Sequence, residues 1–270
     1  MKIIEYGKQN SEIIILLHGG GLSWWNYRSE AQLLDDRYHV VLPVLDGHAD
    51  SDADFISIEE NARRIISFID TEYGGSVLLI GGLSLGAQIL VEMLSQRGNI
   101  CQCAIIESAS IIPSRVTNAM IGPAFSSSYS LIRKRWFAQT QFRYLRIRDD
   151  LFEDYYRDTT KISKENMISF LKANTGYAMK PALRNCQAQV RIIAGGKEQK
   201  GILRSAQQLH NMLPGSTLDI KNGLFHGEYS INHPDQYTAD LLMMLKTILR
   251  LVWYLAWMLC LLFVYSLYER

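Results

Sequence analysis

The chain has 270 residues, of which 48% are hydrophobic, and its formal net charge is +1. This length suits one large α/β domain with a sizeable insertion, and the apolar content is enough for a packed core. The near-zero net charge argues against a nucleic-acid ligand or a strongly acidic partner.

Short apolar runs alternate with helical patterns along most of the chain. The predicted strands are Ile13 to Leu17, His39 to Val44, Ser76 to Ile80, Cys103 to Ile106, Val190 to Ala194 and a weaker Leu218 to Ile220. The predicted helices between the early strands are Tyr27 to Asp36, Ile58 to Tyr73 and Ala87 to Arg97. This alternation predicts an α/β fold with a doubly wound, mostly parallel sheet that helices cover on both faces. Catalytic groups of such sheets gather at the carboxyl ends of the strands.

The alternation stops in residues 111–188, which are rich in Arg, Tyr and Phe. Because structureless loops of that length are uncommon, we predict a helical cap insertion over the strand ends, between the core segments 1–110 and 189–250. Its helical patterns lie around Ser130 to Gln139, Asp149 to Asp158 and Ser163 to Asn174. Within it, Pro123 to Ser128 is predicted as a surface loop, with a flexible hinge as the alternative.

The C-terminal segment Leu251 to Tyr268 contains no charged residue, no glycine and no proline. As a helix it would span roughly 27 Å, close to the hydrocarbon thickness of a bilayer, and it is apolar on every face. Trp253 and Tyr268 lie near its ends, as interfacial anchors do. We therefore predict an apolar C-terminal helix over residues 251–270 that makes membrane contact, with a buried terminal helix or a dimer contact as the alternative.

Two features bear on the cellular compartment. The first residues, M-K-I-I-E-Y-G-K, carry no apolar signal segment. The cysteines are too scattered for a disulfide framework or a metal site, so we expect reduced, mostly buried thiols. They are Cys101, Cys103, Cys186 and Cys260. The globular part is therefore expected in the cytoplasm, anchored to a membrane if the C-terminal segment acts as predicted.

A strand, a tight turn and a helix follow one another in Ser76 to Ala87, which reads S-V-L-L-I-G-G-L-S-L-G-A. Such a turn strains the backbone of the serine at its apex and lifts the hydroxyl out of the sheet. Side chains two residues away on either side would collide, and Gly82 and Gly86 provide the space. Ser84 is therefore a candidate nucleophile, which needs a base, an acid and an oxyanion hole.

The first predicted strand ends in His18-Gly19-Gly20-Gly21. Glycines let the backbone approach a substrate closely, and backbone N–H groups can stabilise a developing oxyanion. The predicted oxyanion hole is the N–H of Gly20 and the N–H of Leu85, the residue after the nucleophile. His18 is expected to orient this loop rather than to act as a base. A plain strand-to-helix turn is the alternative for the glycine loop.

The predicted base is His226, which lies in G-L-F-H-G-E after the last predicted strand. A histidine with a near-neutral pKa can take a serine proton and return it to the leaving group. An exposed loop residue without catalytic role is the alternative. Of the other histidines, His39 is expected to be structural in a strand, His210 to lie on the surface of a helix, and His48 and His233 to lie in loops.

Two glutamates are candidates for the acid that orients the histidine. Glu198 follows the predicted strand Val190 to Ala194, and Glu107 ends the run C-A-I-I-E of the neighbouring strand. We favour Glu198, which gives the chain order Ser, Glu, His, and keep Glu107 as the alternative acid. A solvated turn carboxylate is the structural alternative for Glu198.

Together these motifs resemble the α/β-hydrolase fold, in particular its esterase-like members with a helical cap, over roughly residues 11–250. Gly47 to Ser51, G-H-A-D-S, is similar to the family's G-H-G-x-S loop, and Val44 stands where many members carry Asp. The resemblance implies Ser84 as nucleophile, Glu198 as acid and His226 as base, with no metal and no organic cofactor. It does not imply a substrate, because this fold hosts many chemistries.

We therefore expect a serine hydrolase, carboxylesterase- or lipase-like, that cleaves an ester or a related small-molecule acyl substrate through an acyl-enzyme. One alternative keeps the same triad but cleaves a carbon–carbon or thioester bond. Another is a non-catalytic binding or scaffold protein, although such members usually lose the serine or the histidine. Membrane contact through Leu251 to Tyr268 would favour a lipid or hydrophobic acyl ester. The sequence leaves the acyl length and the oligomeric state open.

Overall fold

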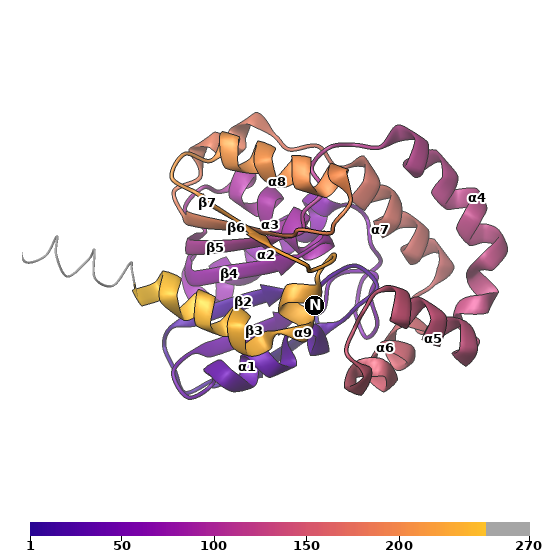
Figure 1. Cartoon of the computed structure of the whole chain (residues 1–270). Helices are drawn as coiled ribbons and strands as arrows, with labels where there is room; N and C mark the ends of the chain where they lie inside the picture. Colours follow the sequence, from indigo (N-terminus) through magenta and orange to yellow (C-terminus); the bar gives the residue numbers. More distant parts are fainter. Residues whose placement is uncertain (247–270) are drawn as a thin grey trace, which may run out of the picture.

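A seven-stranded sheet forms the centre of the molecule (Figure 1). The structure is a computed structural model and describes residues 1–246. The strands are β1 (Ile3–Tyr6), β2 (Ile13–Leu17), β3 (His39–Pro43), β4 (Val77–Leu83), β5 (Cys101–Glu107), β6 (Gln189–Gly195) and β7 (Thr217–Lys221). Their order is β1-β3-β2-β4-β5-β6-β7; β1 pairs antiparallel with β3, and the other described pairs are parallel. The predicted α/β class with a mostly parallel sheet is confirmed.

Helices cover both faces of this sheet (Figure 1). They are α1 (Arg28–Leu34), α2 (Ile58–Tyr73), α3 (Leu85–Gln96), α8 (Lys200–Met212), the short α9 (Glu228–Asn232), the 3₁₀ turn η1 (Trp24–Tyr27) and a helix over residues 234–246. Buried residues of α2, α3 and α8 share one hydrophobic core, and those of η1, α1 and residues 234–246 share the other. The fold is therefore doubly wound, as predicted.

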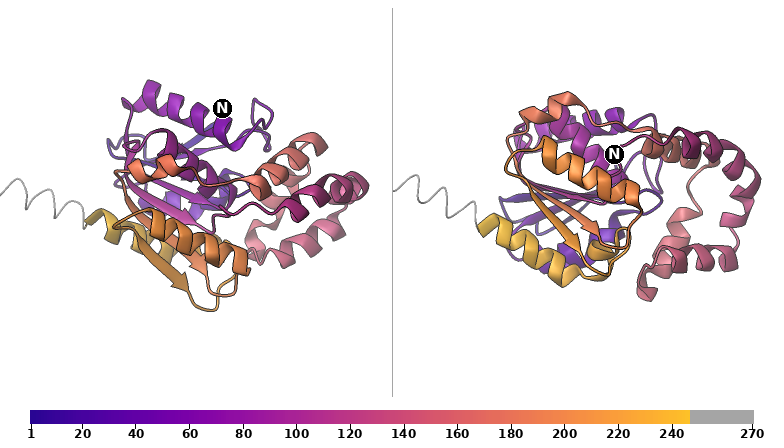
Figure 2. Two further views of the ribbon diagram at one scale, coloured as in Figure 1. Left: turned by 90° about the horizontal axis from the view of Figure 1, so that it is seen from above. Right: turned by 45° about the horizontal axis from the view of Figure 1, so that its top comes forward.

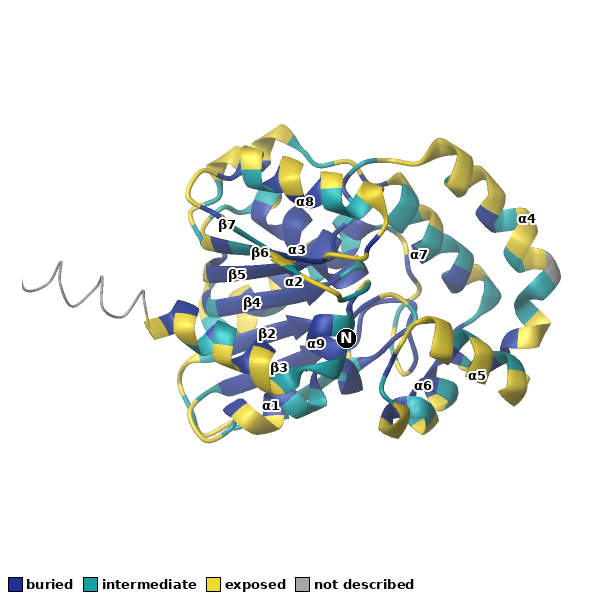
Figure 3. Cartoon of the chain, in the orientation of Figure 1, coloured by how far each residue is buried: buried dark blue, intermediate teal, exposed yellow. Residues whose placement is uncertain are grey.

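The central strands contribute to both cores. In β2, Ile15 and Leu17 belong to the core under α2 and α3, whereas Ile14 and Leu16 belong to the core under α1. Side chains alternate between the two faces of a strand, so a strand that helices cover on both sides must be apolar at every position. Figure 3 shows these strands as buried, with the exposed residues on the outer faces of the helices. The continuous apolar runs of the sequence follow from this arrangement.

The segment between β5 and β6 is helical, as the sequence predicts. Its elements are α4 (Arg115–Ile132), α5 (Arg135–Tyr144), η2 (Asp149–Leu151), α6 (Phe152–Thr159), α7 (Lys164–Gly176) and η3 (Pro181–Asn185). In both views of Figure 2, helices α4 to α7 lie beside one end of the sheet. They are tied to the core by the indole N–H of Trp25, which donates to Asp158 at 3.0 Å, and by the ion pair of Arg28 with Asp154 at 2.7 Å.

Two segments differ from the expectations. The strand β1 was not predicted, because its four residues are too few for a clear pattern and its pairing with β3 stabilises it. The prediction of a surface loop over Pro123 to Ser128 is wrong, because these residues lie inside α4. This helix packs along α7, where Asn118 donates from its side chain to the carbonyl of Lys172 at 2.6 Å. Tertiary contacts of this kind override local composition.

The predicted C-terminal helix over residues 251–270 and Cys260 lie outside the described residues. Within residues 1–246, no helix is both long and apolar enough to cross a membrane. The other cysteines carry free thiols; Cys101 and Cys103 are buried and Cys186 is half-buried.

The hydroxyl of Ser57 caps the N-terminus of α2 by accepting a hydrogen bond from the N–H of Glu60 at 3.1 Å. In a Ser57→Ala variant this N–H loses its partner, so the free energy of unfolding should fall by about 1 kcal/mol. Urea denaturation monitored by circular dichroism measures the change. Ser67→Ala, on the exposed side of the same helix, is the matched control and should cause no loss. Equal losses in both variants would contradict the capping role of Ser57.

Candidate active site

Ser84 lies in the sharp turn between β4 and α3. Its φ of 52° and ψ of −108° are a strained conformation for a residue with a side chain. The two glycines that flank it make the turn possible. A Cβ atom at Gly82 would lie 2.6 Å from the carbonyl carbon of Gly86, and a Cβ atom at Gly86 would lie 2.2 Å from the carbonyl oxygen of Leu17. The turn places Ser84 at the carboxyl end of β4.

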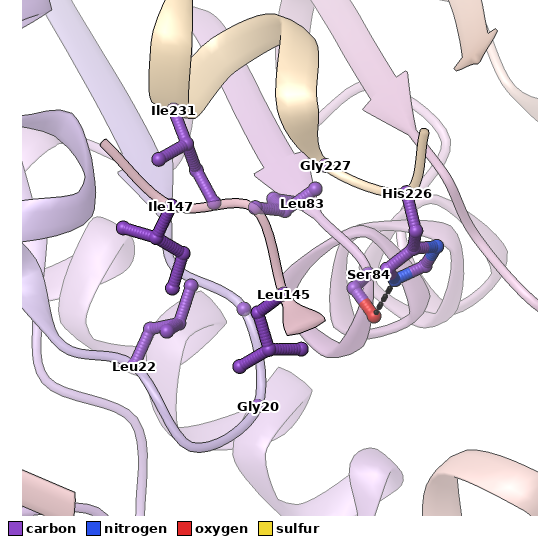
Figure 4. Close-up of a pocket in the computed structure, with 10 residues that line it drawn as sticks. Gly20, Leu22, Leu83, Ser84, Leu145, Ile147, His226, Gly227 and Ile231 are labelled. Atoms are coloured by element: carbon purple, nitrogen blue, oxygen red, sulfur yellow. Dashed lines mark hydrogen bonds between the residues drawn. The ribbon is translucent and has the colours of Figure 1, made fainter. Parts of the chain in front are cut away.

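The structure brings Ser84, His226 and Glu198 together. The Ser84 Oγ lies 2.9 Å from the His226 Nε2, and the His226 Nδ1 lies 2.7 Å from the Glu198 Oε2 (Figure 4 draws the first of these contacts). An ionised carboxylate can only accept, so the Nδ1–H of His226 donates to Glu198 and the Nε2 accepts from the Ser84 hydroxyl. The His226 side chain is 46% exposed, whereas that of Glu198 is fully buried. One end of this chain of contacts therefore faces solvent.

The carboxylate of Glu198 is held by groups beyond the imidazole. The N–H of Gly195 and the hydroxyl of Ser108 each donate to its Oε1 at 2.7 Å. Burial raises the pKa of this carboxyl, but the hydrogen bond and charge of His226, with Ser108 and Gly195, outweigh burial and hold the pKa below its ordinary value. Glu198 is therefore ionised at neutral pH and fixes the tautomer of His226.

Ser108 is a site residue that the sequence analysis missed. It is buried and has a positive φ of 56°, and its hydroxyl also accepts from the N–H of Gly227 at 3.4 Å. It thus connects the backbone beside His226 with the carboxylate of Glu198. No motif marks this serine; its position directly after a strand is the one signal in the sequence.

Glu107, the alternative acid, forms no hydrogen bond with the imidazole in the described structure. Its Oε1 accepts a hydrogen bond from the N–H of Ser230 at 3.2 Å. Burial is complete and raises the pKa of this carboxyl to about 7. The geometry therefore pairs Glu198, and not Glu107, with His226.

The glycine loop after β2 lies against the first turn of α3. A Cβ atom at Gly20 would lie 3.5 Å from the side chain of Leu85. Leu85 begins α3, where the N–H groups have no partner within the helix. Gly20 also lines a cavity with Ser84 and His226. The two residues predicted for the oxyanion hole therefore lie on neighbouring segments beside the serine.

Two buried histidines, His18 and His48, form hydrogen bonds that position this glycine loop. The Nε2 of His18 accepts from the N–H of Leu45 at 3.1 Å, and the Nε2 of His48 accepts from the N–H of Gly21 at 3.0 Å. Burial lowers the pKa of His18 well below its usual range and lowers that of His48 to about 4, so both rings are neutral at neutral pH. The ring of Phe170, from α7, stacks on His48 with centroids 4.7 Å apart. His48 was predicted only as a loop residue, and its contact with Gly21 was missed.

The remaining histidines make local contacts. His39 begins β3, and its Nε2 lies 2.9 Å from the carboxylate of Glu5. His210 lies in α8 and bonds to the hydroxyl of Ser216 at 2.9 Å. His233 follows α9 and packs against the ring of Tyr229.

Two cavities meet at Ser84 and His226. The smaller has a volume of about 60 Å³ and apolar walls, drawn in Figure 4. Its lining is Gly19, Gly20, Leu22, Leu83, Leu145, Ile147, Gly227 and Ile231. The larger has a volume of about 400 Å³ and is lined mainly by hydroxyl and amide side chains. Leu145 and Ile147, which follow α5, bring part of residues 111–188 into the wall of the smaller cavity.

Comparisons with known proteins agree with this fold. The sequence pattern of the alpha/beta hydrolase family matches residues 14–235. A comparison with curated proteins found no match. An esterase from Thermogutta terrifontis superposes with a TM-score of 0.75 at 13% identity, over 92% of this chain and 93% of the esterase. The enol-lactonase from Burkholderia xenovorans LB400 gives 0.77 at 16% identity, over 91% and 96% of the two chains.

MenH from S. aureus is similar as well, with a TM-score of 0.72 at 17% identity, over 91% of this chain and 97% of MenH. At such identities the likeness concerns the fold alone. The family pattern, in contrast, covers most of the sequence, including the turn at Ser84 and the loop at His226. This chain belongs to the alpha/beta hydrolase family.

Proposed function

We propose that this protein is a serine hydrolase that cleaves a carboxylic ester or a related acyl compound through Ser84, His226 and Glu198. One observation carries the proposal: short contacts of 2.9 and 2.7 Å join the hydroxyl, the imidazole and the buried carboxylate in series. This is the arrangement that makes a serine nucleophilic near neutral pH. The similar structures include an esterase and an enol-lactonase, which is in keeping with an ester substrate.

The first half of the reaction forms an acyl-enzyme. The Ser84 Oγ attacks the carbonyl carbon while the His226 Nε2 takes the hydroxyl proton. The negative charge that develops on the carbonyl oxygen is stabilised by the N–H groups of Gly20 and Leu85. The bond to the leaving alcohol then breaks, and His226 returns its proton to the alcohol oxygen. Glu198 keeps the imidazole in the required tautomer and stabilises its positive charge.

The second half consumes water. A water molecule attacks the acyl carbon while His226 takes one of its protons, the bond to the Ser84 Oγ breaks, and the proton returns to that oxygen. The carboxylic acid leaves, and the enzyme is restored. Exposure of the His226 side chain gives water a route to the acyl carbon.

We take residues 111–188 as a cap over this site. The support is that both cavities beside Ser84 have walls from this segment: Leu145 and Ile147 in the smaller, Asn174 and Thr175 in the larger. The cap also contacts the glycine loop, because the hydroxyl of Thr159 donates to the carbonyl of Gly21 at 3.1 Å. Substrate selection is therefore expected to depend on these helices.

A fluorophosphonate probe tests the role of Ser84, because it reacts with serines that a neighbouring imidazole activates. We expect the intact protein to be labelled, the Ser84→Ala variant to remain unlabelled and a His226→Ala variant to label far more slowly. Mass spectrometry of the modified peptide locates the adduct. Ser67→Ala is the matched control and should label as the intact protein does. Equal labelling of Ser84→Ala and the intact protein would remove Ser84 from the mechanism and favour a non-catalytic role.

A further inference from the structure

The larger cavity beside Ser84 differs in chemistry from the smaller one. Most of the side chains on its wall are hydroxyls or amides: Ser108, Ser110, Ser114, Thr117, Asn174, Thr175 and Gln199. Ile112 and Ile202 are the apolar members of its lining, and Glu198 carries its carboxylate. Since the carboxylate of Glu198 is already engaged by His226, Ser108 and Gly195, the wall is polar but without free charge.

Two of these polar side chains have hydrogen-bonding capacity to spare. Within residues 1–246, the hydroxyl of Ser110 and the amide of Gln199 bond to no other residue, although the backbone of each does. Asn174 uses its amide N–H on the side chain of Gln88 at 2.7 Å. Its side-chain carbonyl oxygen is left to accept from a ligand, whereas its backbone carbonyl accepts from Gln88. Donors and acceptors are thus both present on one wall, which suits hydroxyl groups, because a hydroxyl both donates and accepts.

We propose that the leaving alcohol of the substrate is an uncharged polyhydroxyl compound of the glycerol or sugar type, bound in this larger cavity. The inference rests on the serine-hydrolase function proposed above. A volume of about 400 Å³ is sufficient for such an alcohol, since ligand pockets run from roughly 300 Å³ upward. A charged alcohol is disfavoured, because the wall offers no free opposite charge to a cation or an anion.

The other end of the substrate is then a short acyl group. The smaller cavity, about 60 Å³ in volume, has walls of Leu22, Ile147 and Ile231 that suit an apolar chain of a few carbons. Gly20, a predicted oxyanion donor, belongs to the same cavity. The apolar wall and the oxyanion donor therefore place the acyl group in the smaller cavity, and the polar wall places the alcohol in the larger.

Pairs of acetate esters that differ only in their hydroxyl groups test this assignment. Glycerol 1-acetate is compared with propyl acetate, and 6-O-acetylglucose with cyclohexylmethyl acetate. Each hydrogen bond gained is equivalent to about a 2- to 10-fold change in affinity. We therefore expect kcat/KM to favour the hydroxylated member of at least one pair by about 10-fold or more. The two pairs separate a glycerol-type from a sugar-type alcohol.

A double variant, Ser110→Ala with Gln199→Leu, tests whether the larger cavity is responsible. Neither side chain has a partner within the described chain, so the variant is expected to fold. The ratio of kcat/KM between the hydroxylated ester and its plain partner should fall about 10-fold. The matched control is Gln102→Leu, an exposed glutamine of β5 that lines a different cavity, and it should leave the ratio unchanged.

The outcomes separate this inference from the function on which it rests. If all the esters, p-nitrophenyl acetate included, are hydrolysed in a Ser84-dependent way but without preference for hydroxylated alcohols, the inference is wrong and the serine hydrolase stands. An unchanged ratio in the double variant overturns the inference in the same way. If neither p-nitrophenyl acetate nor any other ester is hydrolysed, both proposals fail together.

Discussion

Replacing Glu198 with glutamine is expected to lower kcat for p-nitrophenyl acetate by about 10³- to 10⁴-fold. The carboxylate accepts the Nδ1–H of His226, and the glutamine amide would donate to Nδ1 instead. The imidazole proton then resides on Nε2, which can no longer accept the proton of Ser84. Steady-state kinetics at pH 7.5 measure the loss, and circular dichroism confirms that the variant is folded.

Glu107→Gln is the matched control for this experiment, because both glutamates are buried and both lie at the carboxyl ends of neighbouring strands of the sheet. Glu107 bonds to the backbone of Ser230 rather than to His226, so kcat should stay within about 10-fold of the unmodified enzyme. The opposite pattern, a large loss with Glu107→Gln and normal kcat with Glu198→Gln, would make Glu107 the orienting acid.

The sequence was sufficient to predict the parallel strands of the sheet, because a strand that helices cover on both faces is apolar at nearly every position. All residues of β3 are buried. Short, continuous apolar runs of this kind that alternate with helical patterns predict buried parallel strands. The turn at Ser84 was equally clear, because any residue other than glycine at position 82 or 86 would place its Cβ atom against backbone atoms. Features that follow from local sterics and continuous burial are therefore accessible from the residues alone.

Local patterns could favour Glu198 but could not establish which glutamate contacts His226. Glu107 and Glu198 both come at the carboxyl ends of adjacent strands, so the pattern leaves both within reach of the imidazole. In the structure, Glu198 contacts the imidazole, and Gly195 allows the approach, because a Cβ atom there would lie 2.4 Å from the carbonyl oxygen of Leu224. The loop that carries His226 can thus approach the end of β6 closely. That close approach depends on chain segments far apart in sequence.

The helix α4 illustrates the same limit. Its residues Gly122 to Ser128 include a proline and several serines, a composition typical of loops. The side-chain amide of Asn118 in α4 nevertheless donates to the carbonyl of Lys172 in α7 at 2.6 Å, and α7 packs along the helix. Helical structure here comes from tertiary packing, which a local pattern does not record.

Glu107→Gln is also expected to stabilise the protein at alkaline pH by about 3 kcal/mol. Burial raises the pKa of the Glu107 carboxyl from 4.5 to about 7, the neighbouring charge of Glu198 adds to the effect, and the Oε2 atom has no partner among the described residues. Below pH 4.5 the carboxyl is protonated in both the folded and the unfolded chain, and stability is unaffected. Between pH 4.5 and about 7 only the unfolded chain releases the proton, so the free energy of unfolding falls as the pH rises. Each unit of pKa corresponds to about 1.4 kcal/mol, and above pH 7 the loss is complete.

Glutamine has the shape of the neutral acid and keeps an oxygen that can accept from the N–H of Ser230, so the variant should lose this dependence on pH. Urea denaturation at a series of pH values from 5 to 8.5 compares the two proteins, with Ser84→Ala in both backgrounds to exclude effects of catalysis. The difference in the free energy of unfolding should be small at pH 5 and grow to its full size by pH 8. Glu72→Gln, at an exposed position of α2, serves as the control. Its free energy of unfolding, plotted against pH, should run parallel to that of the unmodified protein. A Glu107→Gln curve that also runs parallel would mean that the carboxyl ionises inside the folded protein as readily as in water, which its complete burial argues against.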